Sequence, residues 1–227
     1  MKSLNQYVQE KLVVRENKNG YNYFPKTKKK LLEIIEKRIK DEGPEVDLND
    51  IDVSKITDMS GLFSGEYSSE FNGNISDWDV SNVTNMSWMF SGCENFNGDI
   101  SNWDVLNVTD MSHMFYRCKK FNQDISQWNT WKVTDTNGMF ADCTLFNQDI
   151  SDWDVSKVTN MMDMFSGCEN FNQPISWWDV SNVTNVSYMF YGCKKFNQDI
   201  SDWDLSNITN GAYMFERCPI EDKYKPR

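Results

Sequence analysis

The residues best suited to chemistry are six cysteines that recur every 25 residues. Thiols can form disulfides, bind zinc or act as nucleophiles. All six occupy one position of a repeat, so their side chains should run parallel and not aim sulfur atoms at one another. Zinc would need convergent ligands such as Cys-x-x-Cys, which the sequence lacks. We therefore expect no metal and a column of buried free thiols that pack as small apolar groups: Cys93, Cys118, Cys143, Cys168, Cys193 and Cys218.

Catalysis has little support elsewhere in the sequence. The only histidine, His113, occupies a repeat position that other copies fill with Trp88, Gly138, Asp163, Tyr188 and Tyr213. So variable a position indicates an outer surface, and the imidazole has no evident Ser or Cys partner. The glycines of the repeats stand singly in turns, unlike those of a phosphate-binding loop. We expect no enzymatic activity and no cofactor.

Carboxylates are a third candidate for chemistry. Asp77 and Asp79, with their counterparts Asp152 and Asp154, carry the oxygen ligands that calcium prefers. The glycine-rich turns of calcium-binding repeats are missing, so a solvated acidic surface is favoured over a calcium site.

Two further polar columns share the period. An asparagine can bond the turn backbone of its own and the next copy, and a threonine hydroxyl can satisfy a backbone group at a corner. A structural role is therefore favoured, with a flat threonine array that binds an ordered lattice such as ice as the alternative. The columns are Asn72, Asn97, Asn122, Asn147, Asn172 and Asn197, and Thr84, Thr109, Thr134, Thr159, Thr184 and Thr209.

The unit that holds these residues in register has a tryptophan every 25 residues, which indicates stacked repeats. Within one copy, DISDWDV at 149–155 predicts a short strand, and the apolar spacing of VTNMMDMFSGC at 158–168 predicts one or two helical turns. We expect an α/β solenoid of leucine-rich-repeat type, with one short parallel strand and one short helix or 3₁₀ turn per copy. The tryptophans join the Asn and Cys columns as structural ladders: Trp78, Trp103, Trp128, Trp153, Trp178 and Trp203.

The chain divides into four parts. Residues 1–20 are a leader or docking segment, and residues 21–50 form a helical N-terminal cap, in which Thr27 caps a helix that runs through Ile39 and stops at Gly43-Pro44. The repeats fill residues 51–218, with a degenerate first copy at 51–70 followed by six 25-residue registers, and 219–227 form a C-terminal tail.

The phrases FNQDISDWDVSKVTNM and MFSGC resemble the repeats of bacterial surface proteins related to mycoplasma lipoproteins, a branch of the BspA-like leucine-rich-repeat proteins. The resemblance covers roughly residues 45–220. It implies an adhesive or interaction protein with no attached chemistry. The opening of the chain resembles short leaders on proteins of Bacteroides-type bacteriophages, which implies a phage or phage-derived source.

A recognition function should lie at positions that vary between copies. One stripe of such positions is acidic with a single aromatic residue: Asp77, Asn102, Gln127, Asp152, Trp177 and Asp202. Trp131 also breaks its column, and an exposed tryptophan beside polar neighbours can anchor an interface. The favoured alternative is a single apolar residue tolerated on a solvated face. Trp88, His113, Tyr188 and Tyr213 form a second candidate patch, interrupted by Gly138 and Asp163.

Charge narrows the choice of partner. Residues 51–227 hold 12 basic and 25 acidic groups, a net charge of −13, which disfavours nucleic acid and favours a protein with a basic surface. We expect a non-enzymatic protein-binding scaffold. A phage-encoded inhibitor of a host defence or DNA-binding protein and a surface adhesin are the alternatives. The sequence shows neither a membrane span nor a signal peptide, so we expect a cytoplasmic location, or an extracellular one if a leader was removed.

Overall fold

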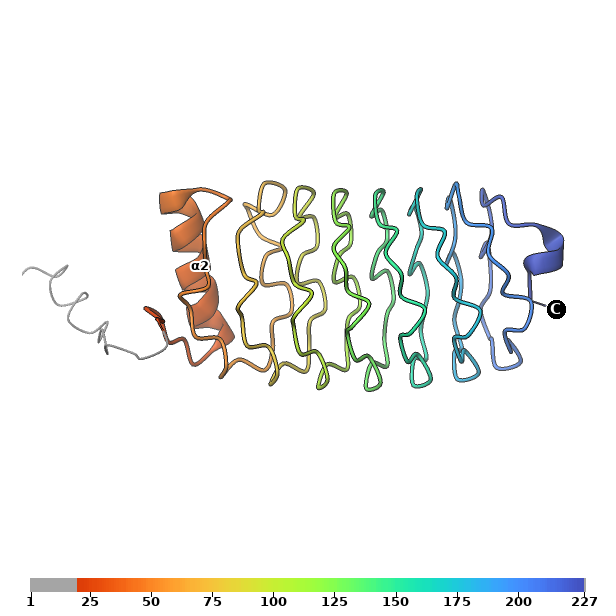
Figure 1. Ribbon diagram of the computed structural model, residues 1–227, viewed down its shortest axis with the longest axis horizontal. Helices are drawn as coiled ribbons and strands as arrows, with labels where there is room; N and C mark the ends of the chain where they lie inside the picture. The colour runs from red at the N-terminus through yellow and green to blue at the C-terminus, as the bar shows by residue number, and fades with distance from the viewer. Residues whose placement is uncertain (1–19, 227) are drawn as a thin grey trace, which may run out of the picture.

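The computed structural model describes residues 20–226, in which 25-residue copies lie side by side along one axis (Figure 1). Its elements are one α-helix, α2 (Lys28–Glu42), and one 3₁₀ helix, η1 (Asp222–Tyr224). Between them, successive copies are joined by isolated parallel bridges such as Asn160 with Asn185. The predicted segment 1–20 lies, apart from its last residue, outside the described residues.

The individual copy differs from the expected strand and helix. Within residues 20–226 no repeat contains either element, and the bridges fall in the segment expected to be helical. There the backbone N–H groups alternate in direction. Those of Met161 and Asp163 donate to carbonyls of the next copy, both at 2.9 Å, whereas that of Met164 bonds the carbonyl of Met161 at 3.2 Å. The apolar residues three and four positions apart therefore lie in a series of turns, and these turns are hydrogen-bonded to the neighbouring copy.

Stacked aromatic rings fill the centre of the repeats. One phenylalanine from each copy belongs to a column in which neighbouring rings lie nearly parallel, with ring centroids 5.3 to 5.8 Å apart. The column consists of Phe63, Phe90, Phe115, Phe140, Phe165, Phe190 and Phe215. Each tryptophan of the column is buried and donates its Nε1–H to a backbone carbonyl of the preceding copy, as Trp153 does to Ile125 at 3.0 Å. The indole thus fills the core and also satisfies a carbonyl that stacking removes from water.

The asparagine and threonine columns hydrogen-bond along the stack. The Oδ1 atom of Asn122 accepts the backbone N–H of Asn147 at 2.8 Å, and the same bond recurs from Asn72 to Asn197. The hydroxyl of Thr159 donates to the carbonyl of Thr134 at 3.3 Å, with the same bond repeated along its column. These side chains hydrogen-bond backbone groups of neighbouring copies, in segments of the described chain that contain no regular strand.

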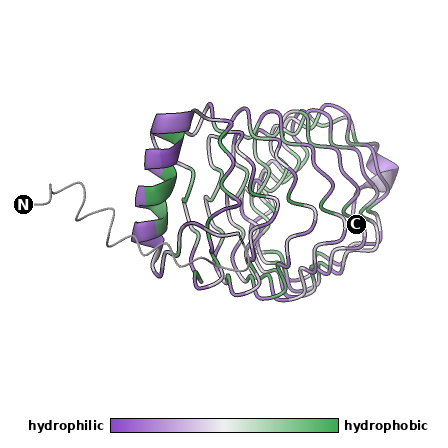
Figure 2. Cartoon of the chain, turned by 60° about the vertical axis from the view of Figure 1, so that its left-hand side comes forward, coloured by the Kyte–Doolittle hydropathy of each residue, from purple (hydrophilic) through white to green (hydrophobic). Residues whose placement is uncertain are grey.

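Helix α2 covers the N-terminal end of the stack. Thr27 caps it by accepting the N–H of Lys30 at 3.3 Å, and Gly43 ends it with φ of 95°. Its buried face consists of Leu31, Ile34, Ile35 and Ile39, and Figure 2 shows the hydrophobic side of the helix turned toward the repeats.

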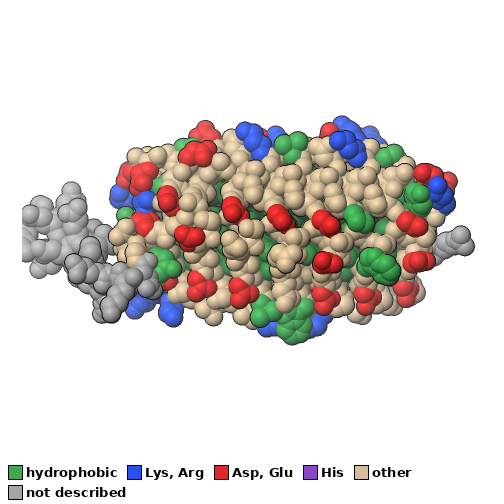
Figure 3. Space-filling view, in the orientation of Figure 1, with side chains coloured by type: hydrophobic (Ala, Val, Ile, Leu, Met, Phe, Trp, Pro, Cys, Tyr) green, Lys and Arg blue, Asp and Glu red, His purple; other side chains and the backbone are tan. Residues whose placement is uncertain are grey.

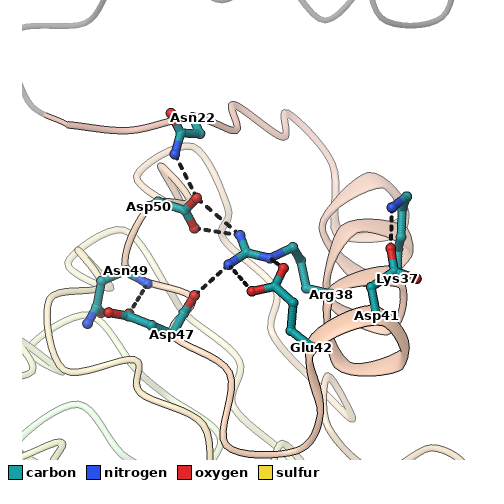
Figure 4. A network of polar contacts seen from close by, with 8 residues as sticks. All are labelled: Asn22, Lys37, Arg38, Asp41, Glu42, Asp47, Asn49 and Asp50. Atoms are coloured by element: carbon teal, nitrogen blue, oxygen red, sulfur yellow. Dashed lines mark hydrogen bonds and ion pairs between the residues drawn. The ribbon is translucent and has the colours of Figure 1, made fainter.

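A polar cluster fixes this helix to the loop that follows it (Figure 4). Arg38 donates to the Oδ1 of Asp50 at 2.8 Å and to the carbonyl of Asp47 at 2.9 Å, and it also pairs with Glu42. Asn22 bonds the same Asp50 carboxylate at 2.9 Å. Because the Arg38 side chain is only 13% exposed, these bonds replace water that the guanidinium has lost.

No helix in the described part of the chain is long and apolar enough to cross a membrane.

Candidate functional site

Most of the acidic residues of the repeats serve turns. The Oδ1 atom of Asp154 accepts the backbone N–H of Ser156 at 3.0 Å and its hydroxyl at 2.6 Å. Two other columns, represented by Asp149 and Asn160, make the same bond to the N–H two residues on. Figure 3 shows acidic side chains in rows along the face it displays. The recurring D-x-S pattern in the sequence could have revealed these turns.

The turn bonds favour the ionised carboxylate. Backbone and side-chain hydrogen bonds from Ser101 lower the pKa of Asp99, and the Ser156 hydroxyl followed by its N–H lowers the pKa of Asp154. Within residues 20–226, no group of three or more Asp, Glu, His or Cys could hold a metal ion. Asp79, one of the residues considered for calcium, accepts two bonds from Ser81.

The stripe proposed as a binding surface is exposed along its whole length: Asp77, Asn102, Gln127, Asp152, Trp177 and Asp202. Trp177 is 88% exposed and stacks on no other aromatic residue of the described chain. Trp131, at 38%, lies in a different column and is covered by two lysines, with the Nζ of Lys157 at 3.9 Å from its ring centroid. The two tryptophans therefore do not form one patch.

The position shared by Trp88 and His113 has a backbone property that the sequence did not reveal. In every copy it adopts a left-handed conformation, with φ between 54° and 61°. Glycine is the residue that adopts this conformation at least cost, and two copies contain it, as Gly61 and Gly138. We call this set the left-handed column: Gly61, Trp88, His113, Gly138, Asp163, Tyr188 and Tyr213.

Trp88 and His113 begin a first aromatic cluster on the left-handed column. Their rings stack with centroids 3.9 Å apart, and Tyr116 meets both rings edge-on. Arg117 lies 5.0 Å from the ring centroid of Tyr116. The Nδ1 atom of His113 is buried without a hydrogen-bond partner among the described residues. Burial lowers the pKa of this imidazole, against an opposing effect of the Asp135 and Asp110 carboxylates.

Tyr188 and Tyr213 form a second cluster at the other end of the column. Their ring centroids are 5.1 Å apart, Tyr191 meets Tyr188 edge-on, and Arg217 lies 5.4 Å from the ring of Tyr191. Both clusters thus combine stacked rings on the left-handed column, a tyrosine three residues on, and an arginine. The sequence analysis missed Tyr116, Tyr191 and both arginines, although they occupy matching positions in their copies.

Small and acidic residues separate the two clusters. Gly138 and Gly167 lie there, with the His113 ring packed over Gly138 and the Asp142 carboxylate over Gly167. An adjoining open hollow of about 340 Å³ is lined in part by Asp142, Ser166, Gly167, Tyr191, Gly192 and Arg217. Burial raises the pKa of Asp163; a bond from Ser166 opposes the shift and the charge of Asp142 adds to it. The surface therefore presents two aromatic clusters separated by Asp142 and Asp163, and Asp142 pairs with Arg117 at 3.7 Å.

The cysteines lie in the core, next in sequence to residues of this surface such as Arg117 and Asp142. Five are buried, and Cys218 is half-buried; each thiol donates to a phenylalanine carbonyl, as Cys143 does to Phe115 at 2.8 Å. Burial raises the pKa of Cys118, Cys143 and Cys168 well above the ordinary thiol value. Neutral thiols of this kind are poor nucleophiles and poor metal ligands.

Comparison with known proteins gives a family. Searches among curated proteins and among solved structures found no match. A protein family described as "Mycoplasma protein of unknown function, DUF285" matches residues 35–144 and 122–224, which together include the end of α2 and all the repeats. The chain therefore belongs to the DUF285 family of Mycoplasma-type repeat proteins.

Proposed function

We propose that this chain is a non-enzymatic scaffold of leucine-rich-repeat type, related to BspA-like surface proteins, that binds another protein through the left-handed column and its two aromatic clusters. One observation carries the proposal. Four positions of the column hold Trp, His or Tyr where the backbone favours glycine.

Backbone strain at these positions favours a functional role. A non-glycine residue in the left-handed region costs roughly 1–2 kcal/mol, and strained backbone of this kind is concentrated at functional sites. Stacking between copies offsets part of the cost, since an aromatic pair contributes about 0.5–1.5 kcal/mol. Much of the aromatic surface still faces solvent: Trp88 is 43% and Tyr213 is 57% exposed. Tyrosine, tryptophan and arginine are also the residues that most often anchor protein interfaces.

Charge supports a basic partner. Asp142 and Asp163 lie between the clusters, where Asp142 also pairs with Arg117 at 3.7 Å. The repeats as a whole carry a net charge of −13 over residues 51–227. A basic protein would be steered toward such a surface, whereas nucleic acid would be repelled.

Because the left-handed backbone accepts glycine, the aromatic side chains can be removed without adding backbone strain. Replacing Trp88, Tyr188 and Tyr213 together by glycine removes three of the four aromatic side chains of the column and leaves residues that fit the left-handed conformation. Tagged full-length chain and this variant are used to capture proteins from a bacterial lysate, followed by quantitative mass spectrometry. We expect a specific basic protein to bind the original chain and to be lost from the glycine variant.

The matched control is Trp177→Asp, which restores the acidic residue of that column and removes the most exposed tryptophan. Equal capture by the original chain and the glycine variant would contradict the proposal. If the partner is lost only from Trp177→Asp, the binding surface is instead the exposed stripe of positions that contains Trp177.

A further inference from the structure

The stack has a polarity that follows from its hydrogen bonds. In each inner copy, N–H groups at alternate residues point toward the next copy. Those of Met161, Asp163, Phe165 and Gly167 donate to the carbonyls of Asn185, Ser187, Met189 and Tyr191 at 2.8 to 3.0 Å. The donors of this segment thus face the C-terminal end of the stack, and the acceptors face the N-terminal end.

The last copy leaves the donors free. The equivalent N–H groups belong to Gly211, Tyr213, Phe215 and Arg217, and none has a hydrogen-bond partner among residues 20–226. We call this row of four N–H groups the donor edge. An unpaired edge of this kind is a template for another polypeptide.

Apolar side chains beside the donor edge are also incompletely covered. Leu205, Ile208 and Phe215 are half-buried, whereas their counterparts one copy earlier, Val180, Val183 and Phe190, are at most 2% exposed. The tail covers another part of this end, through bonds from Glu221 N–H to Asn197 and from Ile200 N–H to the Tyr224 carbonyl. From the tail, Lys225 reaches Phe215, with its Nζ 5.9 Å from the ring centroid.

The polarity excludes a second copy of the chain as the occupant. Two donor edges facing each other would oppose N–H to N–H. The acceptor end of a second copy is covered by α2, whose Lys28 bonds Asp58 of the first copy at 3.3 Å. The missing partner must instead present a row of carbonyl oxygens and apolar side chains along an extended backbone.

We propose that the donor edge binds an extended, apolar segment of another protein, which adds to the end of the stack as a further repeat would. This site is separate from the left-handed column and its clusters except at Tyr213 and Arg217, whose backbone N–H groups, and not their side chains, belong to the edge. The glycine variant described above keeps both N–H groups, so the two proposals can fail independently.

The probe is a synthetic peptide of residues 108–117, VTDMSHMFYR, whose counterpart in the chain accepts the same four bonds from the preceding copy. Full-length chain is titrated with this peptide and with a scrambled version. Binding is followed by fluorescence anisotropy, and exchange of the four edge amides is followed by NMR. We expect binding of the ordered peptide only, with slower exchange at Gly211, Tyr213, Phe215 and Arg217.

Ile208→Lys should weaken the peptide at least about tenfold, because it places a charge where the segment's first apolar side chain packs. The matched control is Leu145→Lys at a leucine that is 49% exposed in the middle of the stack, and it should bind as the original chain does. Absence of binding at millimolar peptide, equal binding by Ile208→Lys, or unchanged exchange at the edge amides would overturn the proposal. So would a concentration-dependent dimer in analytical ultracentrifugation that Ile208→Lys abolishes, because the occupant would then be a second copy.

Discussion

Two glycine-to-alanine substitutions separate backbone strain from side-chain packing, one at Gly138 of the left-handed column and one at Gly192, four residues after Tyr188 of that column. Gly138 has φ of 58°, and a Cβ added there would overlap Nδ1 of His113 and lie 2.5 Å from its Cε1. Gly192 has φ of 70°, but a Cβ added there would make no clash. Its nearest atoms, apart from those of residues adjacent in the chain, are the Cα and N of Gly167 at 3.9 Å. The backbone penalty is shared by the two sites, and the clash is present only at Gly138.

The magnitudes follow from that difference. Either substitution should lower the free energy of unfolding by about 1–2 kcal/mol for alanine in the left-handed region. Gly138→Ala must also displace the His113 ring from its stack on Trp88, which adds about 0.5–1.5 kcal/mol. The measurement is urea denaturation followed by tryptophan fluorescence and far-UV circular dichroism, with coincident transitions required before a free energy is derived.

A double variant completes the test. With His113→Ala present, the overlap disappears, so Gly138→Ala should then cost no more than Gly192→Ala. The reasoning would be refuted by equal costs of the two single substitutions in the original chain, or by an extra cost at Gly138 that persists without the imidazole.

Two further predictions concern the turns and the thiols. Because the folded-state pKa values of Asp99, Asp124, Asp154 and Asp199 are lowered by hydrogen bonds from serine, the stability they provide is present above the unfolded value of about 3.9 and is lost as pH falls through the folded values. The urea concentration at the unfolding midpoint should therefore decrease when the pH is lowered below about 4. An increase on acidification would mean that relief of charge repulsion in this chain, whose net charge is −11, dominates. For the thiols, iodoacetamide followed by mass spectrometry should modify half-buried Cys218 first and the five buried cysteines only on unfolding; rapid native-state labelling of Cys143 would contradict its burial.

The repeat, its length and its inward-facing positions are evident in the sequence because each copy must bury the same side chains against its neighbours. The periodic Trp, Phe and Cys residues mark the core, and the Thr27 to Gly43 pattern marks the helix that covers one end. The variable aromatic residues could also be picked out, since Trp88, Tyr188 and Tyr213 stand at one position of the unit.

Local conformation within the copy depended on tertiary structure. Spacing at threes and fours suits a helix, yet in residues 158–168 alternate N–H groups bond the neighbouring copy and the chain turns left-handed at Asp163 and Gly167. A single copy contains no partner for those bonds, so local propensity could not foretell them. The same bonds hold aromatic residues in a left-handed backbone conformation, bring Tyr116 and Tyr191 beside them, and leave four N–H groups of the last copy without a partner among residues 20–226. Which residues recur and are buried can be read from the amino-acid order, because every copy buries the same side chains. The directions of the backbone groups, and with them both proposed binding surfaces, arise only from the stacking of the copies.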